Sequence, residues 1–138
     1  MPTILAIDVG TVRVGCAVAD DKVGIPFPVA VWPRARGKAE REVLRTLNER
    51  GSSILVVGLP LGPNGERTAM CDVAQDFVRR IQKRSSARIV YVDESFSSLD
   101  AHEKGNFSTE RHETLDAIAA CQILENYFAL SRQGLITE

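Results

Sequence analysis

Two short apolar runs, separated by one helix-length segment, constrain the fold of this chain more than any other feature. The runs are ILVVG at residues 54–58 and RIVYV at residues 88–92. Continuous apolar strands of this kind are buried on both faces, which is typical of parallel sheets. Residues 68–84 between them place apolar side chains at helical spacing, namely Met70, Ala74, Phe77 and Ile81. Parallel strands joined through a helix form a right-handed crossover, so we predict a helix-covered parallel sheet.

The N-terminal segment instead predicts antiparallel strands. Residues 3–8 are apolar and β-branched, and residues 12–19 alternate with period two. One face of this second strand carries small or basic side chains: Arg13, Gly15, Ala17 and Ala19. The dipeptide at 10–11 is Gly-Thr, which is typical of a tight turn, so the two strands are predicted to form a hairpin.

A third strand is predicted over residues 23–32, after a turn at residues 20–22. Pro26 and Pro28 fall within this stretch. Because proline lacks the amide hydrogen that an inner strand donates, the third strand is expected at the edge of the sheet.

Two further helices complete the predicted order of elements. One covers residues 38–50 and ends at Gly51, and the last covers residues 115–131. The resulting fold class is α/β, with a five-stranded mixed sheet in the order 3-2-1-4-5 and helices on both faces. Residues 1–138 are expected to form one domain, since domains usually hold about 100–200 residues.

The distribution of charge is more informative than the net charge of −1. Residues 79–88 carry five basic side chains and no acid, whereas residues 93–116 carry seven acids and two bases. The basic segment could hold phosphates, with Arg80, Lys83 and Arg84 as candidates. Solvated helix faces would produce the same pattern, and charge alone does not separate the two interpretations.

The cysteines and the apolar runs indicate the compartment. Cys16, Cys71 and Cys121 are odd in number and widely spaced, which favours a reducing environment and argues against a zinc site. No apolar run approaches the length of a membrane span, and the N-terminal stretch MPTILAIDVG lacks the basic flank of a signal peptide. We expect a cytoplasmic protein without a membrane partner.

Three carboxylates are predicted to meet at one rim of the sheet. Asp8 ends the first strand and Glu94 lies just past the fifth, so both follow the carboxyl ends of parallel strands. Asp116 shares a helix face with Ala120 and Tyr127, which is the face expected to be buried. A carboxylate in such a place must be paired, protonated or bound to metal, and no buried cation is obvious beside these three.

Carboxylate oxygens select Mg²⁺ or Mn²⁺, and two such ions about 4 Å apart can support phosphodiester hydrolysis. Glu94 is preferred to Asp93 because strand four separates strands one and five by roughly 10 Å, and glutamate reaches further. Ser97 and Ser98 are interpreted as hydroxyls that contact phosphate. Each acid also has a structural alternative, as a turn aspartate, a loop residue or a helix N-terminal acid.

Four segments taken together resemble the YqgF family, whose members are described as Holliday-junction resolvases and as pre-16S rRNA processing nucleases. The segments are DVGTVRVGCAVAD, VVGLPLGPNGE, DESFSS and LDAIAACQIL, in the order that the family has them. The resemblance implies a ribonuclease-H-like fold and phosphodiester cleavage with divalent metal. It also implies that Asp8, Glu94 and Asp116 are catalytic.

One departure from the family concerns the position after the Asp-Glu pair. The family commonly has arginine there, and this chain has Ser95. A phosphate contact would then come from another residue, such as Arg13, Arg67 or Arg111.

The function expected from these observations is that of a metal-dependent nuclease acting on structured RNA or junction DNA, in pre-16S rRNA 5′-end processing, Holliday junction resolution or both. Two alternatives stay open. A non-catalytic RNA- or ribosome-binding module is one; an actin-like nucleotide phosphatase is the other, because residues 8–11 also fit the D-x-G-T phosphate turn. The choice of RNA or DNA, the mode of cleavage, the preferred metal and assembly into a homodimer are likewise open.

Overall fold

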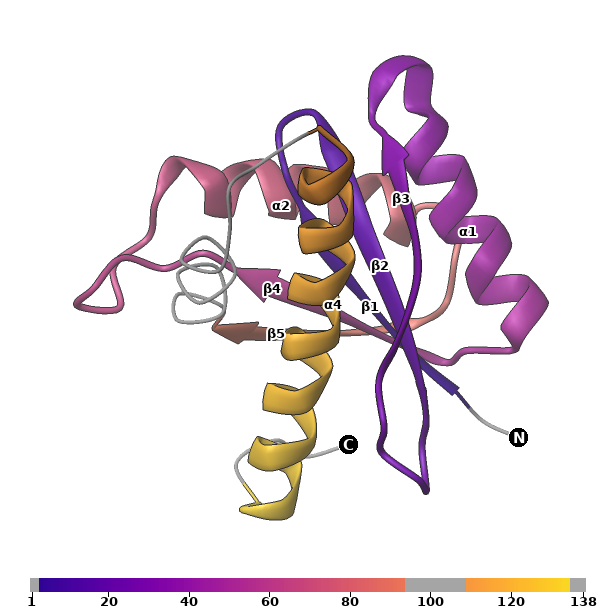
Figure 1. Cartoon of the computed structure of the whole chain (residues 1–138), viewed down its shortest axis with the longest axis vertical. Coiled ribbons are helices and arrows are strands. Elements are labelled where there is room, and N and C mark those ends of the chain that lie inside the picture. The colour runs from indigo at the N-terminus through magenta and orange to yellow at the C-terminus, as the bar shows by residue number, and fades with distance from the viewer. Residues whose placement is uncertain (1–2, 94–108, 135–138) are drawn as a thin grey trace.

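A computed structural model describes residues 3–93 and 109–134, in which helices cover both faces of a five-stranded sheet (Figure 1). The strands are β1 (Thr3–Val9), β2 (Arg13–Asp20), β3 (Phe27–Pro33), β4 (Ile54–Leu59) and β5 (Arg88–Asp93). Their order across the sheet is β3-β2-β1-β4-β5. The β2 strand pairs antiparallel with both β1 and β3, and β4 pairs parallel with both β1 and β5. The predicted sheet and its order are therefore confirmed.

The helices lie in two layers on opposite faces of the sheet (Figure 1). They are η1 (Ala35–Gly37), α1 (Lys38–Arg50), α2 (Ala69–Gln82) and α4 (Thr109–Arg132). Among the described residues, α4 is the helix that packs on one face, whereas α1 and α2 cover the other. Gly51 ends α1 in the left-handed conformation at φ 61°, as predicted, and its amide donates to the carbonyls of Asn48 and Leu47.

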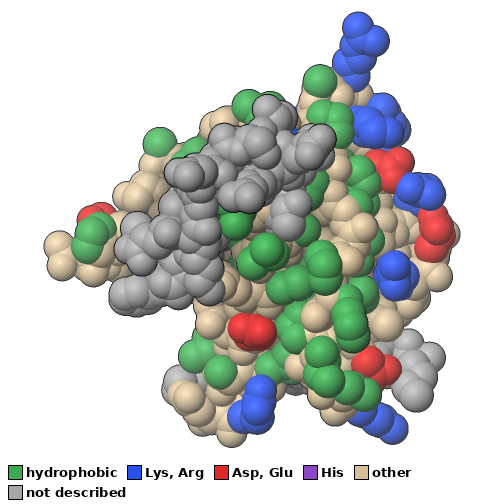
Figure 2. Space-filling model, viewed as in Figure 1, with side chains coloured by type: hydrophobic (Ala, Val, Ile, Leu, Met, Phe, Trp, Pro, Cys, Tyr) green, Lys and Arg blue, Asp and Glu red, His purple; other side chains and the backbone are tan. Residues whose placement is uncertain are grey.

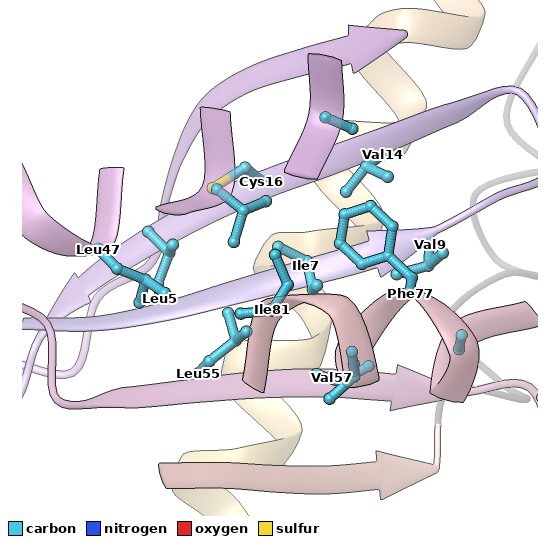
Figure 3. Close-up of a cluster of buried hydrophobic side chains, with 14 of the residues drawn as sticks. Leu5, Ile7, Val9, Val14, Cys16, Leu47, Leu55, Val57, Phe77 and Ile81 are labelled. Carbon is cyan, nitrogen blue, oxygen red and sulfur yellow. The ribbon is translucent and has the colours of Figure 1, made fainter. Parts of the chain in front are cut away.

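The alternation of β1 divides the apolar core in two. Leu5, Ile7 and Val9 face α1 and α2, where they meet Phe77 and Ile81 (Figure 3). These side chains are almost wholly removed from solvent. Burial of each large apolar side chain stabilises the fold by about 1.5–3 kcal/mol, so this layer holds α2 firmly against the sheet.

The opposite face of β1 packs against α4. Ile4 and Ala6 point to this side, together with Ala17 and Ala19 of β2. Their partner is the stripe of α4 that carries the buried residues Ala120, Ile123, Leu124, Tyr127 and Phe128. The small side chains on β2 let a helix backbone approach closely, which matters for the site described below.

Two predicted boundaries are wrong by several residues. The third strand begins at Phe27 rather than residue 23, because the Asp20 carboxylate accepts hydrogen bonds from the amides of Lys22 and Val23 and closes a longer turn. The last helix begins at Thr109 rather than residue 115. Its first turns are polar, and apolar periodicity detects a helix only where one face is buried.

Candidate active site

Asp8 lies one residue before the end of β1, directly opposite Gly15 in the antiparallel pairing with β2. It is half-buried. Side chains at alternate positions of a strand share a face, and Ile4 and Ala6 of the same strand pack against α4. Asp8 is therefore on the α4 face of the sheet, at the rim where β1 ends.

Gly15 allows α4 to touch the sheet at Asp116. A Cβ atom built on Gly15 would lie 2.2 Å from the carbonyl oxygen of Asp116 and 2.4 Å from its carbonyl carbon. No side chain fits into that space, so glycine is required for this approach of helix to strand. Since Gly15 is the cross-strand partner of Asp8, the contact brings Asp116 to the same part of the rim as Asp8.

Arg13 pairs with Asp116 across this contact. Its Nε atom donates to Oδ2 of Asp116 at 2.9 Å, and both side chains are 31% exposed. The sequence offered no obvious buried cation for the acidic cluster, and the structure adds Arg13 as a partly exposed one. Arg13 shares a strand face with Gly15 and so points to α4, which puts the guanidinium beside the carboxylate rather than in solvent. At this exposure such a pair contributes about 0–1 kcal/mol of stability.

The third predicted carboxylate, Glu94, lies outside the described residues, as do Ser95, Ser97 and Ser98. The alternation of β5 nevertheless bears on the choice between Asp93 and Glu94. Val90 and Val92 pack with α4, so the exposed Asp93 has the opposite parity and faces the other side. Within residues 3–93 and 109–134, no group of three or more potential metal-ligating side chains is present.

Arg34 holds the turn that follows Asp8 and was not identified from the sequence. Its Nη1 atom donates to the carbonyl of Gly10 at 3.1 Å, and its amide donates to the carbonyl of Val12 at 2.9 Å. The guanidinium carbon also lies 5.4 Å from the centre of the Phe77 ring. Arg34 follows an edge strand and is 24 residues from Gly10, so no local pattern could have linked the two.

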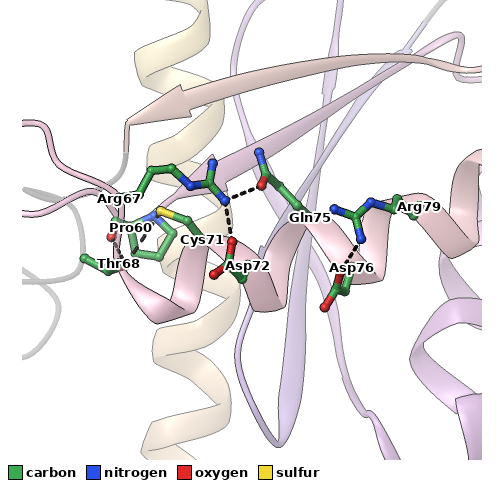
Figure 4. Close-up of polar contacts among 8 residues, drawn as sticks. All are labelled: Pro60, Arg67, Thr68, Cys71, Asp72, Gln75, Asp76 and Arg79. Carbon is green, nitrogen blue, oxygen red and sulfur yellow. Dashed lines mark hydrogen bonds and ion pairs between the residues drawn. The ribbon is translucent and has the colours of Figure 1, made fainter.

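Arg67 is occupied by contacts within its own segment (Figure 4). Its Nη2 atom lies 2.5 Å from both Oδ1 of Asp72 and Oε1 of Gln75, on the first turns of α2. Thr68 fixes the same loop by donating to the carbonyl of Pro60 at 2.6 Å. These contacts favour a structural role for Arg67 over the predicted phosphate contact. The side chain of Arg111 lies outside the described part of the chain.

The basic segment lies on the face of the sheet that α1 and α2 cover, away from the acidic rim. Arg79 pairs with Asp76 at 2.5 Å and Arg80 with Glu40 at 3.5 Å. Lys83 and Arg84 are exposed and form no ion pair with any other residue that the structure describes. Any nucleic acid that contacts both regions must therefore pass around the edge of the sheet.

Comparison with known proteins identifies the family. A family model described as "RuvX: Holliday junction resolvase" matches residues 2–130. The chain belongs to the RuvX family. RuvX proteins form a nuclease family, so the expected phosphodiester hydrolase is confirmed at this level, and divalent metal ions are general among such nucleases.

Curated relatives of this RuvX chain carry the name "Putative pre-16S rRNA nuclease". The protein from Clavibacter sepedonicus is 37% identical over 134 residues, which cover 93% of this chain and 83% of that protein. The protein of the same name from Oleidesulfovibrio alaskensis is 36% identical over 131 residues, which cover 91% of each chain.

Solved structures confirm the ribonuclease-H-like fold. RuvC from Thermus thermophilus matches with a TM-score of 0.62 at 12% identity, over 96% of this chain and 97% of that one. Fowlpox virus resolvase, solved with Holliday junction DNA, matches with a TM-score of 0.54 at 13% identity, over 98% and 99%. Among the described residues of this RuvX chain, no helix has the length and apolarity needed to cross a membrane.

Proposed function

We propose that residues 1–138 form a single nuclease domain in which Asp8, Glu94 and Asp116 hold the metal that cleavage of structured nucleic acid requires. The observation that supports this most strongly is the contact between Gly15 and the backbone of Asp116. It aligns an aspartate of α4 with the strand partner of Asp8, although the two acids are far apart in the sequence. A contact that only glycine permits restricts where α4 lies at Asp116 and is consistent with a positioned acid.

The donor set suits Mg²⁺ or Mn²⁺. Carboxylate oxygens are the ligands that these hard cations prefer, and the half-buried position of Asp8 limits competition from water. Bound there, the metal would supply activation of the attacking water and stabilisation of the leaving oxygen. Asp8 and Asp116 would orient it. Arg13, released from Asp116, would be free to contact a phosphate of the substrate.

The substrate that we propose first is precursor 16S rRNA near its 5′ end, because the curated relatives carry that name. Junction DNA is the second, on the description of the family model. Both are structured polyanions, and both would be met in the bacterial cytoplasm. The acidic rim by itself recognises the phosphodiester and does not distinguish the two sugars.

The test is a cleavage assay with purified wild type, Asp8→Asn and Asp116→Asn in Mn²⁺ or Mg²⁺. Substrates are an rRNA-leader RNA, a four-way DNA junction, a duplex and a single strand. Both variants should lose cleavage by orders of magnitude. Asp76→Asn is the matched control, since it neutralises an exposed aspartate on the opposite face, and it should cut normally. Wild-type binding without cleavage of any substrate would favour the non-catalytic module.

We also propose a homodimer as the assembly to test. Val23, Ile25 and Phe27 are 63%, 54% and 60% exposed where the chain enters the edge strand β3. The three side chains are close together in the sequence, and exposed apolar patches mark interaction surfaces more often than isolated apolar residues do. Sedimentation of wild type beside Phe27→Ser would show a shift to monomer in the variant if this surface is the interface.

A further inference from the structure

A continuous groove runs along α1, on the face of the sheet away from Asp8 and Asp116. Three adjacent pockets form it. The first, beside the β1–β2 turn, shares Glu40 and Arg80 with the second. The second shares Leu44 and Arg84 with the third, which ends near Gly51. We call this feature the α1–α2 groove.

The side chains that line the α1–α2 groove give it a strong positive charge. Five of them are basic: Arg34, Arg41, Arg80, Lys83 and Arg84. Glu40 is the one acid among the residues lining these three pockets. It is only 18% exposed and faces Arg80, so its charge lies beneath the groove and leaves Lys83 and Arg84 uncompensated.

In the part of the groove near Gly51, side chains with hydroxyl groups replace most of the basic ones. Ser53, Ser85 and Ser86 line it beside Arg84. Hydroxyls next to an exposed guanidinium are typical contacts to phosphate oxygens. The groove therefore suits a sugar–phosphate backbone rather than a particular sequence.

The length of the groove fits a short stretch of backbone. Helix α1 has 13 residues and so extends about 20 Å. Phosphates of one strand of a duplex are spaced about 3.4 Å along the axis, so about six would lie beside α1.

The β1–β2 turn connects this groove with the acidic rim. Figure 2 views the α4 side, where hydrophobic side chains spread over much of the surface, and both basic and acidic side chains lie along the margin next to α1. Thr11 and Val12, which line the first pocket, belong to the turn that begins two residues after Asp8. The turn is thus the place where the acidic rim and the α1–α2 groove meet.

The geometry points to the α1–α2 groove as a binding site for the phosphate backbone of a second arm of the nucleic acid, distinct from the strand that is cut at the acidic rim. This inference rests on the proposed nuclease function and deepens it. A straight helix lying on the rim cannot also follow α1 on the other face, whereas a bent or branched molecule can pass around the β1–β2 turn. Because the two binding regions lie on opposite faces of the sheet, the protein would prefer bent or branched nucleic acid to a straight duplex.

The test compares the double variant Lys83→Gln, Arg84→Gln with the control Lys22→Gln, Arg132→Gln. Both lose two exposed positive charges, and the control pair lies by the β2–β3 turn at the far end of α4. Binding to a four-way DNA junction, a hairpin RNA of the rRNA leader and a straight duplex is measured by fluorescence anisotropy in EDTA at several salt concentrations. Melting curves confirm that all variants are folded.

The groove variant should bind the junction or the hairpin at least about tenfold more weakly and lower its salt slope by about two. The straight duplex should lose less affinity, and the control variant should bind every probe nearly as wild type does. A loss of affinity for the junction alone would mean that the second arm is DNA, and a loss of affinity for the hairpin alone would mean that it is RNA.

Equal losses for all three probes, or equal losses in the control, would overturn the second-arm site. This binding measurement does not require cleavage or metal at the acidic rim, so it tests the groove separately from the nuclease proposal. If Asp116→Asn abolishes cleavage while the groove variant binds normally, the groove inference fails and the nuclease proposal stands.

Discussion

Arg13 Nε and Asp116 Oδ2 lie 2.9 Å apart, joining β2 to α4 at the rim of the sheet. The pair neutralises a carboxylate that we propose as a metal ligand, so Asp116 need not repel Asp8 when no metal is bound. Binding of a divalent cation would replace the guanidinium as the partner of Asp116. Arg13 would then be available to bind a phosphate of the substrate. Metal binding and phosphate binding at the rim would therefore be coupled through this one side chain.

Gly15→Ala should destabilise the fold by about 3 kcal/mol, because the new methyl group overlaps the backbone of Asp116 rather than a movable side chain. Urea unfolding followed by circular dichroism measures this. Gly65→Ala is the matched control, since Gly65 has a φ of +77° but nothing within 4 Å of its Cβ position, and it should cost only about 1 kcal/mol. An equal loss of stability in the two variants would mean that α4 can shift to accommodate the methyl group and that Gly15 does not set the position of Asp116.

Arg13→Gln should strengthen the response to metal and weaken the response to nucleic acid. Removing the competing cation should lower the apparent Kd for Mn²⁺ by up to about fivefold, as measured by the rise in Tm at each metal concentration. Affinity for a non-cleavable nucleic acid in the presence of Mn²⁺ should fall, with a salt slope smaller by about one, because metal releases Arg13 from Asp116 only in the wild type.

Arg45→Gln is the control for Arg13→Gln, because Arg45 also pairs with carboxylates, Glu42 and Glu49, but on α1. It should leave both measurements near wild type. A smaller rise in Tm with Mn²⁺ for Arg13→Gln would contradict the competition and would make Arg13 a residue that positions Asp116 for the metal.

Cys16 should make the fold sensitive to alkaline pH. Burial raises the pKa of this thiol from its ordinary value of 9.0 to about 12. As the pH rises above 9, the unfolded chain loses this proton while the folded chain keeps it, so stability is full below about pH 9 and declines toward pH 12. The decline from one such group is about 1.4 kcal/mol per pH unit.

Urea unfolding of wild type and Cys16→Ala between pH 8 and pH 10.5 isolates this contribution. Burial also raises the pKa of Tyr91 and of Cys121, but both variants share those groups. The alanine variant should be less stable at pH 8 because of the cavity, and its stability should fall less steeply with pH. Parallel curves would show that the thiol is accessible to hydroxide in the folded state.

Only some features of the acidic site could be predicted from local sequence patterns. The sequence predicted β5 to be buried on both faces and left the choice between Asp93 and Glu94 to side-chain length. Only the structure shows that Val90 and Val92 pack with α4 and that Asp93 faces the other side. The partner of Asp116 was not predictable either. Arg13 was considered as a phosphate contact, and its position 103 residues before Asp116 leaves no periodic signal.

The basic segment shows a second limit. Its charge was evident from the sequence, but its distance from the acids was not, since a helix can present its cations to any side. The packing of Phe77 and Ile81 against the sheet sets the orientation of α2. Because these two side chains are buried, Arg80 faces α1, where it pairs with Glu40.

The sequence by itself determined the elements and their order. An apolar, β-branched run predicted β1, period-two alternation predicted β2, continuous apolar runs predicted β4 and β5, and Gly51 predicted the end of α1. All of these signals depend on neighbours within a few residues. Only the tertiary structure decided that Arg13 meets Asp116, that Arg34 braces the turn after Asp8, and that the cations of α2 line a groove behind the sheet. The reason is physical: these contacts depend on how closely packed layers approach one another. For α4 and the sheet, that distance is set at one position, Gly15, by the absence of a side chain.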